Sequence, residues 1–283
     1  MSNKWGQKIV GPRCVVTGCD ATHEWMLSWW WKHYNKTNSY PVVFADFGMT
    51  QQARKWCRER GTLLTLSQKY KRNWFKKPRA ILESPYKIVI WVDLDCEVRK
   101  DLNPLFLHAD KGIGVTKDPY TPFCKKHVKM GKAVATGVVV ARHGHPLIVK
   151  WANIVDAKHQ SMRGDQEAFN SMLHKIKDQL SIMPPDHQWL RRDGDNKDAI
   201  IMHWTGPRGK NYIKKKLPKG ARQPPRNVTS RPSKPKKIKN LIKPASVAKP
   251  KPIKKSKMSA VPVTVNRRKP LLRQKIRVIR SPR

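Results

Sequence analysis

The feature that most limits how this chain can fold is an abrupt change of composition near Lys216. All 11 Trp, all 5 Cys and all 19 Asp and Glu residues precede that point. Residues 217–283 contain 22 Lys or Arg, 11 of the 22 prolines, and neither an acidic nor an aromatic residue. Because such a segment cannot bury enough apolar surface to offset the entropy lost on ordering, it is predicted to be disordered. We therefore expect a folded domain over residues 1–216 and a basic Lys/Arg/Pro-rich tail over residues 217–283.

The formal net charge is +41, of which the tail supplies +22 and the first 216 residues the remaining +19. A charge of this size favours polyanionic partners, so we expect the tail to bind nucleic acid or another polyanion. The start of the chain lacks the apolar run of a secretory signal, and no later run approaches the roughly 18 apolar residues of a membrane span. We therefore expect a cytoplasmic protein without a membrane span. Its 5 cysteines form no C-x-x-C pair and are expected to be reduced thiols.

Short β-rich runs alternate with helical patterns through the first 216 residues. This alternation is typical of an α/β fold with a mostly parallel central sheet and helices on both faces. The expected strands are residues 14–19, 42–46, 63–66, 87–92, 112–116, 134–141, 180–183 and 199–204. The expected helices are residues 24–34, a segment that Thr50 caps and Gly61 ends, and residues 146–159 and 166–179.

The expected strand at residues 87–92 runs into two carboxylates, Asp93 and Asp95. In extended backbone, side chains at i and i+2 point to the same side, so this pair could hold one hard divalent cation. Ligands of largely parallel sheets gather beyond the carboxyl ends of the strands, where the pair stands. An Asp-x-Asp triplet alone is a weak signal, since a chain of this length contains about one by chance. The alternative is a pair of solvated loop acids.

Three further segments place polar residues at the ends of expected elements. The first strand, CVVTGCD, ends in an acid; RGDQEAFN begins a helix with an acid and an amide; and HWTGPRGK carries a strand-ending histidine into a basic, glycine-bearing loop. Each residue also has a simpler interpretation, because the acids could cap helices and a lone histidine is more often structural. The residues concerned are Thr17, Asp20, Asp165, Gln166, His203, Gly206, Arg208 and Lys210.

Taken together, these segments resemble the family-8 glycosyltransferases, retaining enzymes of the GT-A fold that use nucleotide-activated sugars. The resemblance spans roughly residues 14–210. It implies that Thr17 and Asp20 contact the nucleotide, and that Asp93, Asp95 and His203 hold the metal ion. It also implies that Asp165 and Gln166 are the catalytic residues beside the donor sugar.

The resemblance further implies that the loop after His203 grips the diphosphate. Gly206 belongs to that loop, and either Arg208 or Lys210 would meet the phosphates. Upstream of the metal pair, KKPRAILESPY occupies the place of a helix whose basic residue contacts the donor, and Lys76, Lys77 and Arg79 compete for that role. The family's Asn-Ala-Gly element is replaced here by Ala135-Thr136-Gly137.

These residues suit the cleavage of a sugar–diphosphate bond, because a divalent ion and a nearby cation stabilise the charge that develops on the leaving diphosphate. Carboxylate ligands with one imidazole favour Mn²⁺ (or Mg²⁺) over zinc. We therefore expect a metal-dependent glycosyltransferase that moves a hexose from a nucleotide sugar, UDP-linked, to a glycan, protein or lipid acceptor, with retention. The alternatives are a sugar-phosphate nucleotidyltransferase and a basic nucleic-acid-binding or polyanion-binding protein with an inactive transferase-like domain.

Overall fold

A computed structural model describes residues 8–120, 133–173, 176 and 179–217. The tail is predicted to be disordered and to bind polyanions. Its residues 218–283 lie outside the described ranges. Cys124 also lies outside them. The other four cysteines are buried free thiols, as expected. None of the helices within the described ranges is long and apolar enough to cross a membrane.

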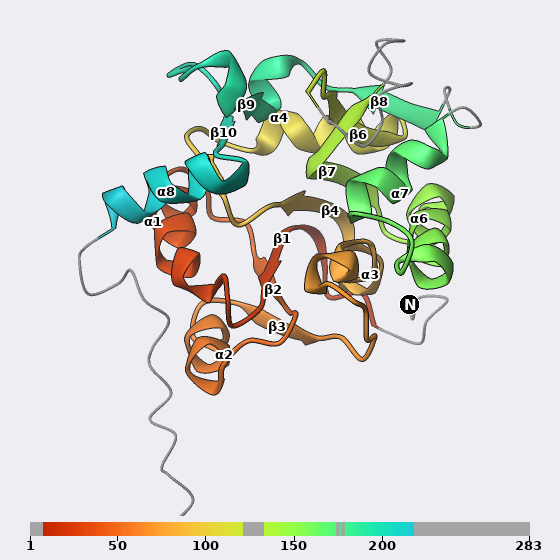
Figure 1. Ribbon diagram of the computed structural model, residues 1–283, viewed down its shortest axis with the longest axis horizontal. Helices are drawn as coiled ribbons and strands as arrows, with labels where there is room; N and C mark the ends of the chain where they lie inside the picture. Colours follow the sequence, from red (N-terminus) through yellow and green to blue (C-terminus); the bar gives the residue numbers. More distant parts are fainter. Residues whose placement is uncertain (1–7, 121–132, 174–175, 177–178, 218–283) are drawn as a thin grey trace, which may run out of the picture. The chain divides into compact units, whose positions relative to one another are not determined.

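The central sheet has seven strands in the order β3-β2-β1-β4-β7-β6-β8 (Figure 1). Its parallel pairs are β1 with β2, β1 with β4, β2 with β3, and β6 with β8, while β7 is antiparallel to both β4 and β6. The mostly parallel sheet is therefore confirmed. The strands are β1 (Gly11–Cys19), β2 (Val42–Asp46), β3 (Thr62–Thr65), β4 (Tyr86–Val92), β6 (Ile113–Lys117), β7 (Val134–Arg142) and β8 (Leu180–Ile182).

Helices cover both faces of this sheet, as the sequence predicts. Alternate residues of β4 point to opposite faces: Ile90 and Val92 join one apolar cluster with α1, α2, α4 and α8, while Val89 and Trp91 join another with α3, α6 and α7. Thr50 caps α2, as expected, through an Oγ1 that accepts the Ala53 N–H at 3.2 Å. The helices are α1 (Leu27–Thr37), α2 (Gln51–Arg58), α3 (Lys77–Glu83), α4 (Asn103–Phe106), α6 (Pro146–Lys158), α7 (Asp165–Ser171) and α8 (Gly206–Lys216).

A second, smaller sheet has the order β5-β10-β9 and contains the last expected strand. β10 (Ile201–His203) lies antiparallel to β5 (Cys96–Val98) and parallel to β9 (Trp189–Leu190). The expected strand at residues 199–204 is thus three residues long, and it does not join the central sheet. This sheet sets the geometry of the site, because β5 directly follows the Asp93–Asp95 segment.

Three local predictions are wrong. Asp93 to Asp95 do not continue the extended strand: the chain turns there from β4 into β5, and the Cys96 N–H bonds the Asp93 carbonyl at 2.9 Å. The helix expected at residues 166–179 ends at Ser171, after which the Met172 N–H bonds the carbonyl three residues back. The loop expected after His203 is the first turn of α8, which follows extended Thr205 and accommodates a proline in its opening turn.

Candidate active site

A cleft of about 260 Å³ opens beyond the carboxyl ends of β1 and β4. Its lining comes from the segments that follow these two strands, from the beginning of α3 and α7, and from α8. Six of the predicted site residues line it: Asp20, Lys77, Asp93, Asp95, Asp165 and Lys210. Side chains as far apart in the sequence as Asp20 and Lys210 therefore border one cleft.

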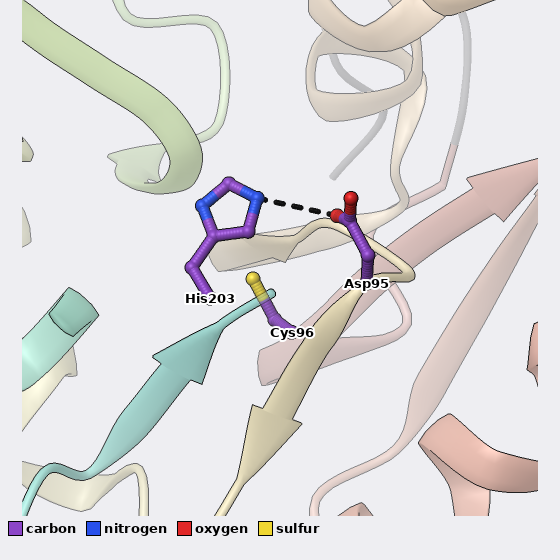
Figure 2. A group of neighbouring side chains, drawn as sticks. All are labelled: Asp95, Cys96 and His203. Atoms are coloured by element: carbon purple, nitrogen blue, oxygen red, sulfur yellow. Dashed lines mark hydrogen bonds and ion pairs between the residues drawn. The ribbon is translucent and has the colours of Figure 1, made fainter. Parts of the chain in front are cut away.

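His203 approaches the acidic pair because of the second sheet. In the register of β10 with β5, His203 lies opposite Cys96, the residue after Asp95. Its Nε2 lies 3.2 Å from Asp95 Oδ1 and 4.0 Å from Asp93 Oδ2. Figure 2 shows the imidazole and the Asp95 carboxylate pointing toward each other, with the Cys96 thiol beside them. The structure therefore brings together the three side chains that the sequence suggests as metal ligands.

The donor atoms of Asp95, Cys96 and His203 are spaced as ligands of one ion would be. One ligand atom each from Asp95, Cys96 and His203 lies within 4.8 Å of the others. Burial, with the nearby charges of Asp95 and Asp93, raises the pKa of the Cys96 thiol well above its usual value. A protonated thiol is a poor ligand, so Asp95 and His203 remain of this group, and Asp93, whose Oδ2 lies 4.0 Å from His203 Nε2, would supply a second carboxylate. That donor set fits a hard divalent cation such as Mn²⁺ or Mg²⁺.

Gln188 determines which nitrogen of the His203 ring carries the proton. Gln188 Oε1 accepts the Val138 backbone N–H at 3.1 Å and the Thr116 hydroxyl at 3.0 Å. Its Nε2 therefore faces His203 Nδ1, at 2.9 Å, and donates to it. The neutral imidazole then carries its proton on Nε2 and donates it to Asp95. An ion that used Nε2 would require the proton on Nδ1 and the Gln188 amide reversed, at the loss of the bond from Val138.

A lysine accompanies each of the two carboxylates. Lys210 Nζ lies 2.8 Å from Asp95 Oδ2, and Lys77 Nζ lies 2.9 Å from Asp93 Oδ1. Burial opposes ionisation of Asp95, but Lys210 and His203 hold the pKa of that carboxyl well below its usual range. Asp95 is thus ionised at neutral pH, and the two lysines hold both carboxylates in place.

Lys77 also joins the acidic pair to the predicted sugar-side residues. Its Nζ lies 3.0 Å from Asp165 Oδ2 and donates to the Thr136 carbonyl at 3.0 Å. Burial raises the pKa of Asp165 above its usual value, and Lys77 offsets only part of this rise because Asp93 shares its charge. Burial alone would lower the pKa of Lys77, but the charges of Asp165 and Asp93 outweigh burial and raise that pKa above its usual value. This buried cluster fixes the start of α3 against the start of α7.

A second cleft, of about 340 Å³, adjoins the first and shares Trp74 and Asp165 with it. Gln166 lines this cleft, where its Nε2 donates to Asp118 Oδ2 at 2.7 Å and its Oε1 accepts the Thr136 N–H at 3.3 Å. His203 lines the same cleft from β10. The amide of Gln166 is therefore held next to the group of donor atoms.

Asp20 lines the first cleft and orders the turn that follows β1, and it is the N-cap of neither helical element after that turn. Its Oδ1 accepts the backbone N–H groups of Thr22 and His23, both at 3.1 Å. Burial opposes ionisation, but hydrogen bonds from the His23 ring and from the Asn73 side-chain amide lower the pKa of Asp20 to about 2. The carboxylate is therefore charged and oriented whether or not a ligand is bound.

Four predicted residues do not meet the group of donor atoms. Thr17 is fully buried in β1, and its hydroxyl has no hydrogen-bond partner among the described residues. Arg79 pairs with Asp156 on α6, on the other side of α3 from the cleft residue Lys77. Gly206 begins α8 with a φ of +76°. Arg208 is exposed on α8, whereas Lys210 reaches Asp95.

Three residues of the site were not predicted. Gln188 orients His203, Asn73 donates to Asp20 Oδ2 at 2.9 Å, and the Trp91 indole donates to Asp93 Oδ1 at 2.6 Å. Asn73 stands four places before Lys77, so the segment that the family resemblance marks could have indicated it. Nothing in the sequence around Gln188 distinguishes it from a surface glutamine, because its role depends on a contact across 15 residues.

No family model matches the chain, and no curated protein matches it. Solved structures do match. The glycosyltransferase GlyE of Streptococcus pneumoniae TIGR4 has 18% identity over 69% of this chain and 55% of its own, with a TM-score of 0.50. The galactosyltransferase LgtC, in complex with donor and acceptor sugar analogs, has 14% identity over 70% and 88%, with a TM-score of 0.50. The bifunctional glycosyltransferase WbbM has 12% identity over 69% and 46%, with a TM-score of 0.51.

The chain thus spans about half the length of GlyE and WbbM. At these identities the likeness establishes the fold and leaves the activity to be argued from the site. The described part of this chain has the α/β fold of the GT-A glycosyltransferases, with a mostly parallel central sheet.

Proposed function

We propose that this chain is a glycosyltransferase that moves a hexose from a nucleotide sugar, UDP-linked, to an acceptor hydroxyl. The observation that supports this most is the convergence of Asp93, Asp95 and His203 beside a cleft that Lys210 also borders. The fold of the solved glycosyltransferases supports it as well. Retention of anomeric configuration is what the resemblance to the family-8 enzymes implies.

Asp93, Asp95 and His203 would hold Mn²⁺ or Mg²⁺, which supplies positive charge where the leaving diphosphate becomes negative. The chain adds its own cation at that point, because Lys210 lies 2.8 Å from Asp95 and lines the cleft. Lys210 rather than Arg208 is therefore the residue we assign to the diphosphate. Asp20 would bind the nucleotide at the far end of the same cleft.

Asp165 and Gln166 would act on the sugar side. Their helix begins at the junction of the two clefts, where a sugar attached to a diphosphate in the first cleft would enter the second. The Gln166 amide can orient the anomeric carbon or stabilise the positive charge that develops on it. Lys77 would keep Asp93 and Asp165 at a fixed separation. We assign this activity to residues 1–216 and polyanion binding to the tail, residues 217–283.

The test is UDP release from UDP-glucose and UDP-galactose, with Mn²⁺ or with chelator, for the wild type and for Asp93→Asn, Asp95→Asn and His203→Ala. We expect release that depends on the metal and falls at least about a hundredfold in each variant. Asp198→Asn is the matched control, because that carboxylate is 94% exposed and lies outside both clefts. Release that all three variants retain at the wild-type rate would refute the proposal.

A further inference from the structure

The outer part of the second cleft is bordered by arginines and aromatic rings. Three of its lining residues are Arg72, Arg163 and Arg192, and two more are Trp74 and Tyr120. The inner part holds Asp165 and Gln166, the residues to which we assign the donor sugar, and the proposed metal ligand His203. An acceptor must therefore pass this outer part to bring its hydroxyl to the sugar. The inference below rests on the proposed function.

Within the described part of the chain, neither Arg72 nor Arg192 forms a hydrogen bond or ion pair with an acid that lines the cleft. Arg72 donates to the Arg163 carbonyl at 2.9 Å and Arg192 to the Tyr120 carbonyl at 3.3 Å, and neither carbonyl carries a formal charge. Of the acids that line the cleft, Asp165 pairs with Lys77 and Asp118 accepts from Gln166. The guanidinium groups of Arg72 and Arg192 therefore place positive charge at the border of the cleft, which favours an acceptor that carries negative charge.

An arginine lies against each aromatic ring of the border. The Arg72 guanidinium is 5.2 Å from the Trp74 ring centroid, and the Arg192 guanidinium is 5.5 Å from that of Tyr120. Trp74 is 40% exposed, which is unusual for so large an apolar side chain. Flat aromatic faces beside guanidinium groups are the combination that binds nucleobases and phosphates of an unpaired strand.

We propose that the acceptor is a single-stranded nucleic acid, rather than the glycan, protein or lipid expected from the sequence alone. A neutral glycan would use the aromatic faces but not the guanidinium charges. A duplex would not fit, because a cleft of about 340 Å³ can take an unpaired or extruded nucleotide only. The net charge of +19 on residues 1–216 would attract such a strand. RNA is the form we expect to accept the sugar, since every ribose offers a 2′-hydroxyl.

In the transfer, the hydroxyl oxygen of the nucleotide forms a bond to the anomeric carbon of the hexose. The bond from that carbon to the β-phosphate oxygen breaks, and UDP leaves with the electron pair. The hydroxyl proton passes to an oxygen of the departing diphosphate. The products are the O-glycosylated strand and UDP.

The experiment uses the full chain with Mn²⁺, a mixture of UDP-glucose and UDP-galactose, and one of three acceptors: an unstructured RNA oligonucleotide, the DNA oligonucleotide of the same sequence, or a sulfated glycan. Mass spectrometry measures the hexose added, and calorimetry measures UDP binding in the absence of any acceptor. The variants are Arg72→Gln and Arg192→Gln, with Arg58→Gln as the control. Arg58 is exposed on α2 and lines neither cleft.

We expect hexose on the RNA, and a fall in kcat/KM for RNA of about tenfold in each cleft variant with the control within about twofold. UDP binding should be the same in all of these proteins. UDP binding without transfer to RNA, transfer to the sulfated glycan instead, or cleft variants equal to Arg58→Gln would each overturn the inference and leave the proposed function standing. Absence of UDP binding in the wild type would refute the proposed function, and this inference with it.

Discussion

Replacement of Lys77 by methionine tests the buried cluster that joins α3 to α7. Lys77 is 5% exposed, and its ammonium lies 2.9 Å from Asp93 and 3.0 Å from Asp165. Methionine has a similar length and no charge, so Lys77→Met leaves two carboxylates facing each other without a cation. Removal of one partner from a buried ion pair costs about 3–5 kcal/mol.

The structure allows a second calculation of the same cost. Asp165 is buried, and without Lys77 it avoids the buried charge by keeping its proton. From its ordinary pKa of 3.8, holding that proton at pH 7 costs roughly 1.4 kcal/mol per pH unit, or about 4 kcal/mol, and the deficit against the wild type is smaller because burial already raises the pKa of Asp165 there. At pH 5 the cost falls to about 2 kcal/mol. The sign follows because the folded state binds the extra proton, so the stability of the variant falls as the pH rises above 3.8.

Urea unfolding followed by tryptophan fluorescence measures this difference at pH 7 and pH 5. Lys76→Met is the control, because Lys76 is the neighbouring lysine and its side chain is only partly buried. The reasoning is refuted if the Lys77→Met deficit is the same at both pH values, or if it equals that of the control.

Three further variants test other contacts of the site. Asp20→Asn should lower the free energy of unfolding by about 1–2 kcal/mol at pH 7, after allowance for solvent screening. This deficit should shrink as the pH falls from about 4 to 2, because wild-type Asp20 takes up its proton over that range. Unfolding measured at a series of acidic pH values tests it. Gly137→Ala should lose about 1–3 kcal/mol in urea unfolding and weaken UDP binding, because its Cβ would lie 2.4 Å from His203 Cε1 and 2.6 Å from Gln188 Nε2. Gln188→Glu should tighten Mn²⁺ binding about tenfold in a calorimetric titration. The new carboxylate can accept from both the Val138 N–H and a proton on His203 Nδ1, which leaves His203 Nε2 free of its proton and able to bind the ion. Unchanged affinity would contradict the tautomer that we assign.

The sequence pattern was sufficient to predict most of the central sheet. β2 is five buried apolar or acidic residues in a row, and its predicted bounds agree with those in the structure. β7 shows the same near-continuous burial. Short runs rich in β-branched residues favour buried strands, so their position depends little on distant partners. The short strands β5 and β9 could not be predicted in this way, because each pairs only with β10 in the second sheet. The helix α8 could not be predicted either, because its contact through Lys210 is with Asp95, far away in the sequence.

The types of residue in the site could be predicted, but several of their partners could not. Asp93, Asp95 and His203 follow apolar strands, which made them recognisable. Arg79 and Lys77 are two residues apart on α3, and the sequence does not say which of them faces the cleft. Lys77 turns inward because two acids and the Thr136 carbonyl surround its ammonium, whereas Arg79 finds Asp156 on α6.

The choice between Arg208 and Lys210 has the same physical origin. A loop would have left both side chains free to reach the phosphates, but the first turns of α8 give each residue a fixed direction. Gly209 lies between them, and a Cβ at that position would stand 1.7 Å from the Trp204 carbonyl oxygen, so α8 begins pressed against the end of β10. That close approach brings Lys210 to Asp95 and leaves Arg208 exposed. The glycine next to the lysine therefore decides which cation belongs to the cleft, and any larger residue at position 209 should separate Lys210 from Asp95 before it affects the fold of the central sheet.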